Sequence, residues 1–157
     1  MNTEALNRWL TLGANVGVIA GIVFLGVEIQ QNTAVTRSVA AQEISNTSVE
    51  YFMRIAENPD LARVVMVANA DPGTLSDVEI IQYHYVTGAV FLLLEGAYIQ
   101  FQLGFLPEAS WKPYEKVIKD FLSNPVSRNW WVNGSTVFSP EFETMVIAVS
   151  GLEREIN

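Results

Sequence analysis

The sequence predicts an all-α protein in which a single N-terminal transmembrane helix continues into a long helix and is followed by a small helical bundle. Three observations lead to this prediction. A long apolar run without charge lies near the start of the chain, the remainder carries helix caps and helical periodicity, and no segment alternates apolar and polar residues as a half-buried strand does. Half of the 157 residues are apolar, which is enough to build a core, and the length suits one folded domain.

The composition excludes several classes of protein. The chain carries 17 acidic and 9 basic residues, a net charge of −8, and so lacks the basic surface that a nucleic-acid partner requires. It has no cysteine, which excludes disulfides, cysteine-bound zinc and thiol nucleophiles. The single histidine, His84, leaves little material for a metal site or a triad, and no phosphate loop, nucleotide fingerprint or nucleophile elbow occurs. We therefore expect no cofactor, no metal and no enzymatic activity.

The first helix is predicted to cross a membrane. Nineteen residues from Trp9 to Val27 lack an ionisable side chain, and as a helix they span roughly 28 Å, close to the ~30 Å hydrocarbon core of a bilayer. A signal peptide would need a small-x-small cleavage site, which the residues after Val27 do not offer. A core helix would have to hide its whole circumference in a small domain. We expect residues 1–30 to anchor the chain in the membrane and residues 31–157 to form a helical domain outside it.

Small residues recur on one face of this segment, because Gly13, Gly17 and Gly21 follow one another every four residues. Membrane helices associate through close backbone approach, which glycine permits, and the Asn15 amide needs a hydrogen-bond partner in hydrocarbon. The alternative is that glycine is simply common in membrane helices. The pattern favours a helix–helix interface formed by these four residues, with either a second copy or a different protein as the partner.

A polar collar follows the apolar run, where Glu28, Gln31 and Asn32 stand at the end of the hydrocarbon. In an oligomer these side chains would ring an axis, as carboxylate rings do in cation pathways. Polar residues are also usual where a helix passes through the headgroup layer. Arg8 and Arg37 flank the segment without an excess of basic residues on one side, so charge predicts no topology.

The long helix is predicted to run from Asn7 to Glu57, because no glycine or proline interrupts the chain from Val27 to Asn58. Asn58-Pro59 then starts a short helix, which ends at Asp71-Pro72-Gly73.

The next predicted helix opens with a capping box at Ser76 and Glu79 and runs to about Leu103, where Gly104 stops it. Its charge-free stretch from Tyr85 to Leu94 is ten residues, too short to cross a bilayer. We expect a buried helix of the bundle here, and a second membrane span is the alternative.

Three shorter helices complete the predicted bundle. The first opens at Pro107 and reaches Leu122. Asn124-Pro125 opens the second, which runs to Asn133, and Ser139-Pro140 caps the last, which runs to about Glu153.

Two ionisable residues of the bundle are candidates for a role. His84 and Glu95 lie eleven residues apart on one helix, roughly 16 Å, which is too far for a shared metal or a direct proton transfer. We expect a structural role for both. Because Glu95 stands in an apolar run, it requires a partner, and the prediction is a buried ion pair with Arg54, Arg63 or Arg128 from a neighbouring helix.

Two adjacent tryptophans, Trp130 and Trp131, are candidate contact residues. Aromatic rings this close in a short helix are not expected to share one core, so we expect one ring to pack in the bundle and the other to meet a neighbouring protein or lipid headgroups. A ligand shelf is a further alternative.

Two sets of residues resemble a group of small bacterial proteins of unknown function. The first set comprises Ala14-Asn15-Val16-Gly17, Gly21, Phe24-Leu25 and Glu28-Ile29-Gln30-Gln31-Asn32-Thr33. The second comprises Asn124-Pro125, Arg128, Trp130-Trp131 and Phe138-Ser139-Pro140-Glu141-Phe142. The resemblance spans essentially the whole chain and implies one membrane helix before a compact helical domain, in a bacterial inner membrane, without an established activity or site. In that group a basic residue often stands in the place of Gln30. Because this chain has no basic residue at that position, charge does not assign its extramembrane domain to the cytoplasm.

The leading functional hypothesis is a non-enzymatic, membrane-anchored assembly protein, either a self-oligomerising scaffold or a small accessory subunit of a larger membrane complex. Its partners would be the lipid bilayer and either itself or that complex. The alternative is a homo-oligomeric pore or channel lined by the first helix, with Asn15 and Glu28 in the lining. An enzyme that uses Glu95 or His84 ranks third.

Overall fold

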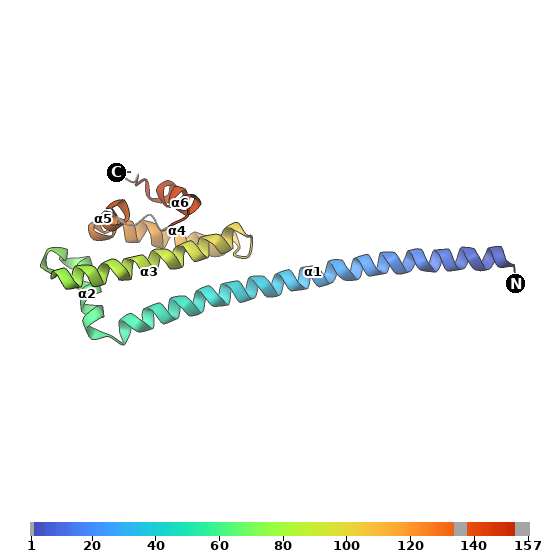
Figure 1. The fold of residues 1–157 in the computed structure, drawn as a ribbon, viewed down its shortest axis with the longest axis horizontal. Coiled ribbons are helices and arrows are strands. Elements are labelled where there is room, and N and C mark those ends of the chain that lie inside the picture. Colours follow the sequence, from blue (N-terminus) through green and yellow to red (C-terminus); the bar gives the residue numbers. More distant parts are fainter. Residues whose placement is uncertain (1, 134–137, 153–157) are drawn as a thin grey trace. The chain divides into compact units, whose positions relative to one another are not determined.

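The computed structural model describes residues 2–133 and 138–152, and these residues form helices without any strand (Figure 1). The elements are α1 (Thr3–Ala56), α2 (Pro59–Ala70), the 3₁₀ helix η1 (Pro72–Thr74), α3 (Asp77–Gln102), α4 (Glu108–Ser123), α5 (Pro125–Asn133) and α6 (Pro140–Ser150). The predicted all-α fold, a long N-terminal helix followed by a small helical bundle, is confirmed.

The chain forms two compact units, Met1–Val39 and Ala40–Asn157. The first unit is the first part of α1 and contains the predicted membrane segment. The second unit contains the last part of α1 and all the other helices. Residues 31–39, which were expected to belong to the extramembrane domain, fall in the first unit.

Helix α1 starts four residues before the predicted Asn7 and ends one residue before the predicted Glu57. Its threonines do not interrupt it, because their hydroxyls donate to carbonyl oxygens one turn back. Thr33 Oγ1 lies 2.8 Å from the Ile29 carbonyl oxygen, and other threonines of α1 repeat the arrangement. The helix stops just before Asn58-Pro59, since a proline disfavours helical backbone in the residue before it.

The predicted start of α2 is confirmed. The Asn58 side-chain oxygen accepts a hydrogen bond from the backbone N–H of Leu61 at 3.1 Å, and Pro59 occupies the first helical position, where its missing N–H is not needed.

Helix α3 begins and ends as predicted. The Glu79 carboxylate accepts hydrogen bonds from the backbone N–H and the hydroxyl of Ser76, both at 2.8 Å, and it also forms an ion pair with Arg63 of α2. At the other end α3 stops at Gln102, before Gly104, whose φ of 74° breaks the helix. The first turn of α3 is therefore fixed by its own cap and by α2.

The last three helices follow the predicted order. Helix α6 ends at Ser150, earlier than the predicted Glu153, which lies outside the described residues. The reason is Gly151, whose φ of 71° takes the left-handed conformation and terminates the helix.

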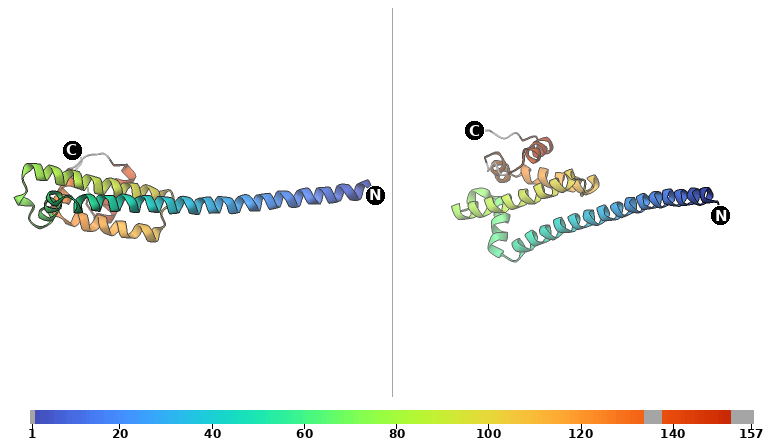
Figure 2. Two further views of the ribbon diagram at one scale, coloured as in Figure 1. Left: turned by 90° about the horizontal axis from the view of Figure 1, so that it is seen from below. Right: turned by 45° about the vertical axis from the view of Figure 1, so that its right-hand side comes forward.

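Helix α3 is the central helix of the second unit. Helices α2, α4 and α5 pack on it, and α4 also packs on α5 and α6. Helices α3 and α4 run antiparallel alongside each other (Figures 1 and 2). Seven residues of α3 are buried, so it is a core helix of the bundle, as expected.

An aromatic cluster around Phe91 of α3 forms the middle of the core. The Phe91 ring is fully buried and stacks on Trp130 and Trp131 of α5, with centroid separations of 5.3 and 4.9 Å. Phe121 of α4 meets it edge-on at 6.1 Å. The other buried members of this core are Ile44, Val90, Leu94, Ala97, Tyr98, Leu106, Trp111, Ile118, Leu122, Phe138, Phe142 and Val146.

A smaller core cluster joins α2 to α3 and consists of Val64, Ala68, Leu75 and Tyr83. The Tyr83 hydroxyl hydrogen-bonds the buried Ser127 hydroxyl of α5 at 2.9 Å. This bond satisfies two polar groups that burial would otherwise leave unpaired.

Asn124 links α2 to α5. Its side-chain oxygen accepts from the backbone N–H groups of Val126 at 2.8 Å and Ser127 at 3.3 Å, which caps α5. Its amide nitrogen donates to the Asn69 side chain at 3.0 Å and to the Ala68 carbonyl at 3.4 Å, at the end of α2. One side chain thus satisfies polar groups at two helix ends.

We predict that Asn124→Ala lowers the free energy of unfolding by about 1–2 kcal/mol, because it removes a helix cap together with the contacts to α2. The measurement is denaturant unfolding of the full chain in mild detergent, followed by tryptophan fluorescence. Asn133→Ala is the matched control, since among the described residues the Asn133 side chain bonds to Asn129 of the same helix α5. Equal stability of the two variants would count against the role of Asn124.

Candidate functional site

The apolar segment of α1 is exposed on all sides. Between Trp9 and Val27, eleven large apolar side chains are each 48–72% exposed. The most apolar window of this helix has a mean hydropathy of 2.1, and none of it is buried. Among the described residues, α1 is the one helix long and apolar enough to cross a membrane. Because a core helix would be covered by its own domain, the core-helix alternative does not fit this segment.

The predicted interface residues lie on the open surface of this segment. Added β-carbons at Gly13, Gly17 and Gly21 would meet no atom within 4 Å, so none of the described residues occupies the glycine face. Asn15 is exposed, and its amide has no hydrogen-bond partner among the described residues. The proposed role of these four residues as a helix–helix interface stays a prediction.

The collar residues Glu28, Gln31 and Asn32 are also exposed on α1. They follow the apolar segment directly along the helix, where a polar surface suits a headgroup layer. The structure adds no contact that would give them a further role.

Glu95 has a partner other than the one expected. Its Oε1 accepts a hydrogen bond of 2.6 Å from the backbone N–H of Ser139, the N-cap residue of α6. The predicted ion pair is therefore corrected: within the described residues Arg54 pairs with Glu50, Arg63 pairs with Glu79, and Arg128 donates to the Leu122 carbonyl. The physical reason is that the N-terminus of α6 offers an unpaired N–H and a partial positive charge, which satisfy a carboxylate without a cation.

The two tryptophans both face the bundle. Trp131 is fully buried and Trp130 is partly buried, and both rings stack on Phe91. The expectation that one ring packs in the bundle fits Trp131, and a contact of Trp130 with a neighbouring protein or lipid stays a prediction. The approach is close because α3 carries Gly88 beneath Trp130, where an added β-carbon would lie 3.4 Å from the indole.

His84 lies at the exposed edge of this aromatic cluster. Its ring meets Trp130 edge-on with centroids 5.6 Å apart. Within the described residues, no group of three or more His, Asp or Glu side chains could hold a metal ion.

A groove of about 460 Å³ separates the last part of α1 from α3. Burial raises the pKa of Tyr51 in this groove to about 12, and the neighbouring Tyr83 adds to the rise. The exposed Glu50–Arg54 ion pair, at 2.6 Å, stands at its rim. The groove is lined by Thr47, Glu50, Tyr51, Arg54, Ala89, Leu92 and Leu93.

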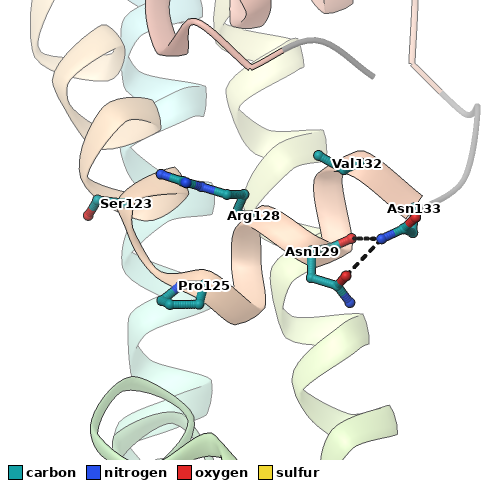
Figure 3. Close-up of a pocket in the computed structure, with 6 residues that line it drawn as sticks. All are labelled: Ser123, Pro125, Arg128, Asn129, Val132 and Asn133. Carbon is teal, nitrogen blue, oxygen red and sulfur yellow. Dashed lines mark hydrogen bonds between the residues drawn. The ribbon is translucent and has the colours of Figure 1, made fainter. Parts of the chain in front are cut away.

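A second pocket, of about 290 Å³, lies along α5 (Figure 3). Arg128 points across it, and the Asn133 amide donates to the Asn129 side-chain oxygen at 2.7 Å on its other side (Figure 3). The full lining is Ser123, Pro125, Arg128, Asn129, Val132 and Asn133. These residues include no carboxylate or histidine, so the pocket offers hydrogen bonds to a polar group and lacks an acid–base pair.

No protein-family model matches the chain, and no curated protein or solved structure matches it significantly.

We predict that Glu95→Ala lowers the free energy of unfolding by about 1.5–3 kcal/mol, since a hydrogen bond to a charged group is lost and the Ser139 amide is left unpaired. Hydrogen exchange of the α6 amides in the full chain should rise at the same time, whereas Glu57→Ala, an exposed carboxylate on the same domain, should change neither quantity. Unchanged exchange in α6 would contradict the assigned contact.

We also predict that the domain loses stability between pH 10 and pH 12. Below pH 10 the Tyr51 phenol is neutral in both the folded and the unfolded chain. Above pH 10 it ionises first in the unfolded chain, because its pKa in the folded chain is raised to about 12. The unfolding temperature of the full chain, measured across this pH range, should fall less for Tyr51→Phe than for the wild type. Part of the pH dependence remains in this variant, because burial also raises the pKa of Tyr114. An identical pH dependence in Tyr51→Phe would refute the assignment.

Proposed function

We propose that this chain is a non-enzymatic, membrane-anchored assembly protein, which acts either as a self-oligomerising scaffold or as a small accessory subunit of a larger membrane complex. The observation that carries the proposal is the exposure of the whole apolar segment of α1. A soluble monomer rarely exposes a contiguous apolar surface of this length, whereas a bilayer covers it completely.

The glycine face supports assembly within the membrane. Lipid chains are as apolar as leucine, so membrane helices associate by close packing and by hydrogen bonds and not by exclusion from water. The open surface at Gly13, Gly17 and Gly21 permits such packing, and the Asn15 amide offers a hydrogen bond that no described residue takes up. The membrane would be the bacterial inner membrane that the resemblance implies.

The mechanism is geometric. The first unit would dock on a partner helix in the bilayer, and the second unit, tied together at its helix ends by Asn124 and Glu95, would present a fixed surface outside it. No chemical step is needed for this role.

We predict that Gly17→Leu lowers the native mass of the protein extracted from its own membranes in mild detergent, because the leucine side chain prevents close helix approach. Gly26→Leu is the matched control: it lies on the same helix but on the opposite face, about 140° or more from the three glycines, and it is equally open in the structure.

The wild-type mass separates the two forms of the proposal. A multiple of 17.4 kDa indicates a homo-oligomer, and co-migration with larger foreign proteins indicates an accessory subunit. A native mass that is the same for wild type, Gly17→Leu and Gly26→Leu contradicts an interface on the glycine face.

A further inference from the structure

Arg128 carries a positive charge that no described carboxylate neutralises. The chain has 17 acidic residues against 9 basic ones, so a carboxylate partner is the ordinary state of a basic residue here. Ion pairs with carboxylates occupy four other basic residues of the second unit, which are Arg54, Arg63, Lys112 and Lys116. Among the described residues, Lys119 and Arg128 form no such pair. Both lie near the junction of α4 and α5, where positive charge is therefore left over.

The Arg128 guanidinium is held on one edge and open on the other. Its Nε–H donates to the carbonyl oxygen of Leu122, at the end of α4, over 3.3 Å. A guanidinium has five N–H donors, and the four on its two terminal nitrogens form no hydrogen bond with a described residue. This outer edge has the planar geometry that binds a carboxylate through two parallel hydrogen bonds.

The guanidinium lies across the pocket of about 290 Å³ along α5 (Figure 3). Pro125 and Val132 give this pocket apolar lining. Asn129 lines its other side, where the Asn129 side-chain oxygen accepts from the Asn133 amide at 2.7 Å. The Asn129 nitrogen therefore keeps N–H groups that no described residue accepts. The lining combines unused N–H donors with apolar surface and contains no carboxylate.

These features select a small anion with a single charge. A pocket of this volume is at the lower end for ligand sites, so it suits a small group and excludes a nucleotide. The carbonyl end of α4 has a partial negative charge, and the chain as a whole carries −8. Both disfavour a phosphate dianion more than a carboxylate. Asp120, which lies three residues before Ser123 of the lining, is paired with Lys116 and does not take up Arg128.

We propose that this pocket binds an organic monocarboxylate. The carboxylate receives two hydrogen bonds from the outer edge of Arg128, and a compact apolar group packs against Pro125 and Val132. The Asn129 amide donates to a carbonyl oxygen of the ligand where one is present. The free end of a polypeptide and a small free acid share this chemistry. The site belongs to the second unit and does not depend on membrane anchoring, so it goes beyond the proposed function.

The test compares isocaproate with isocaproamide, its neutral counterpart of almost the same shape. Nitrogen-labelled full chain in mild detergent is titrated with each compound, and magnetic resonance follows the side-chain N–H signals of Arg128 and Asn129. We expect isocaproate to shift these signals to saturation and isocaproamide to require at least about tenfold higher concentration, because the amide has no charge to pair with the guanidinium. This comparison uses the wild-type chain and needs no variant.

Arg128→Gln should weaken isocaproate binding by about tenfold or more, with the Asn129 signal as the readout. Lys112→Gln is the matched control, because it removes one positive charge from the same unit at a residue that does not line the pocket. Denaturant unfolding of both variants establishes that they are folded before they are titrated.

N-acetyl-leucine separates the two sources of the carboxylate, because it has the same isobutyl group and adds the amide carbonyl of a chain end. Tighter binding of N-acetyl-leucine than of isocaproate supports the proposal with a polypeptide end as the ligand, and equal or weaker binding supports it with a free acid. Equal responses to isocaproate and isocaproamide, no shift with any of these compounds, tighter binding of inorganic phosphate than of isocaproate, or equal binding by folded Arg128→Gln and Lys112→Gln would each overturn the proposal.

Discussion

The structure depends on one constraint, which is the apolar surface of the first part of α1. None of the described residues covers this surface. Transfer of a half-exposed large apolar side chain out of water is worth roughly 1 kcal/mol, so the eleven such side chains of the first unit amount to on the order of 10 kcal/mol. That is comparable with the whole stability of a typical domain, about 5–15 kcal/mol. A bilayer would remove this surface from water.

The second unit holds its short helices together by two kinds of contact. Aromatic rings from α3, α4 and α5 fill the centre around Phe91. At the helix ends, Asn124 and Glu95 satisfy backbone groups that burial would otherwise leave unpaired. Both residues join segments far apart in the sequence, so they fix how the helices are arranged as well as where they start.

Local signals in the sequence were sufficient for most of the fold. Asn58, Ser76 and Gly104 set helix ends through hydrogen bonds or backbone conformations that involve only nearby residues, and these ends were predicted. The partner of Glu95 could not be predicted, because it depends on where α6 meets α3. The placement of Trp130 beside Trp131 on Phe91 depends in the same way on how α5 crosses α3. The sequence of α3 could not show which of its faces is the core, because a helix that is apolar all round gives no such signal.

Extraction of membranes at alkaline pH tests the central claim most directly, because it removes peripheral proteins and leaves those that span the bilayer. Cells that make the full chain are lysed, and their membranes are washed with alkaline carbonate and sedimented. Membrane anchoring by the first part of α1 predicts that the chain remains in the membrane pellet and is released only by detergent. A chain recovered in the soluble fraction, or in the carbonate supernatant, would contradict the account.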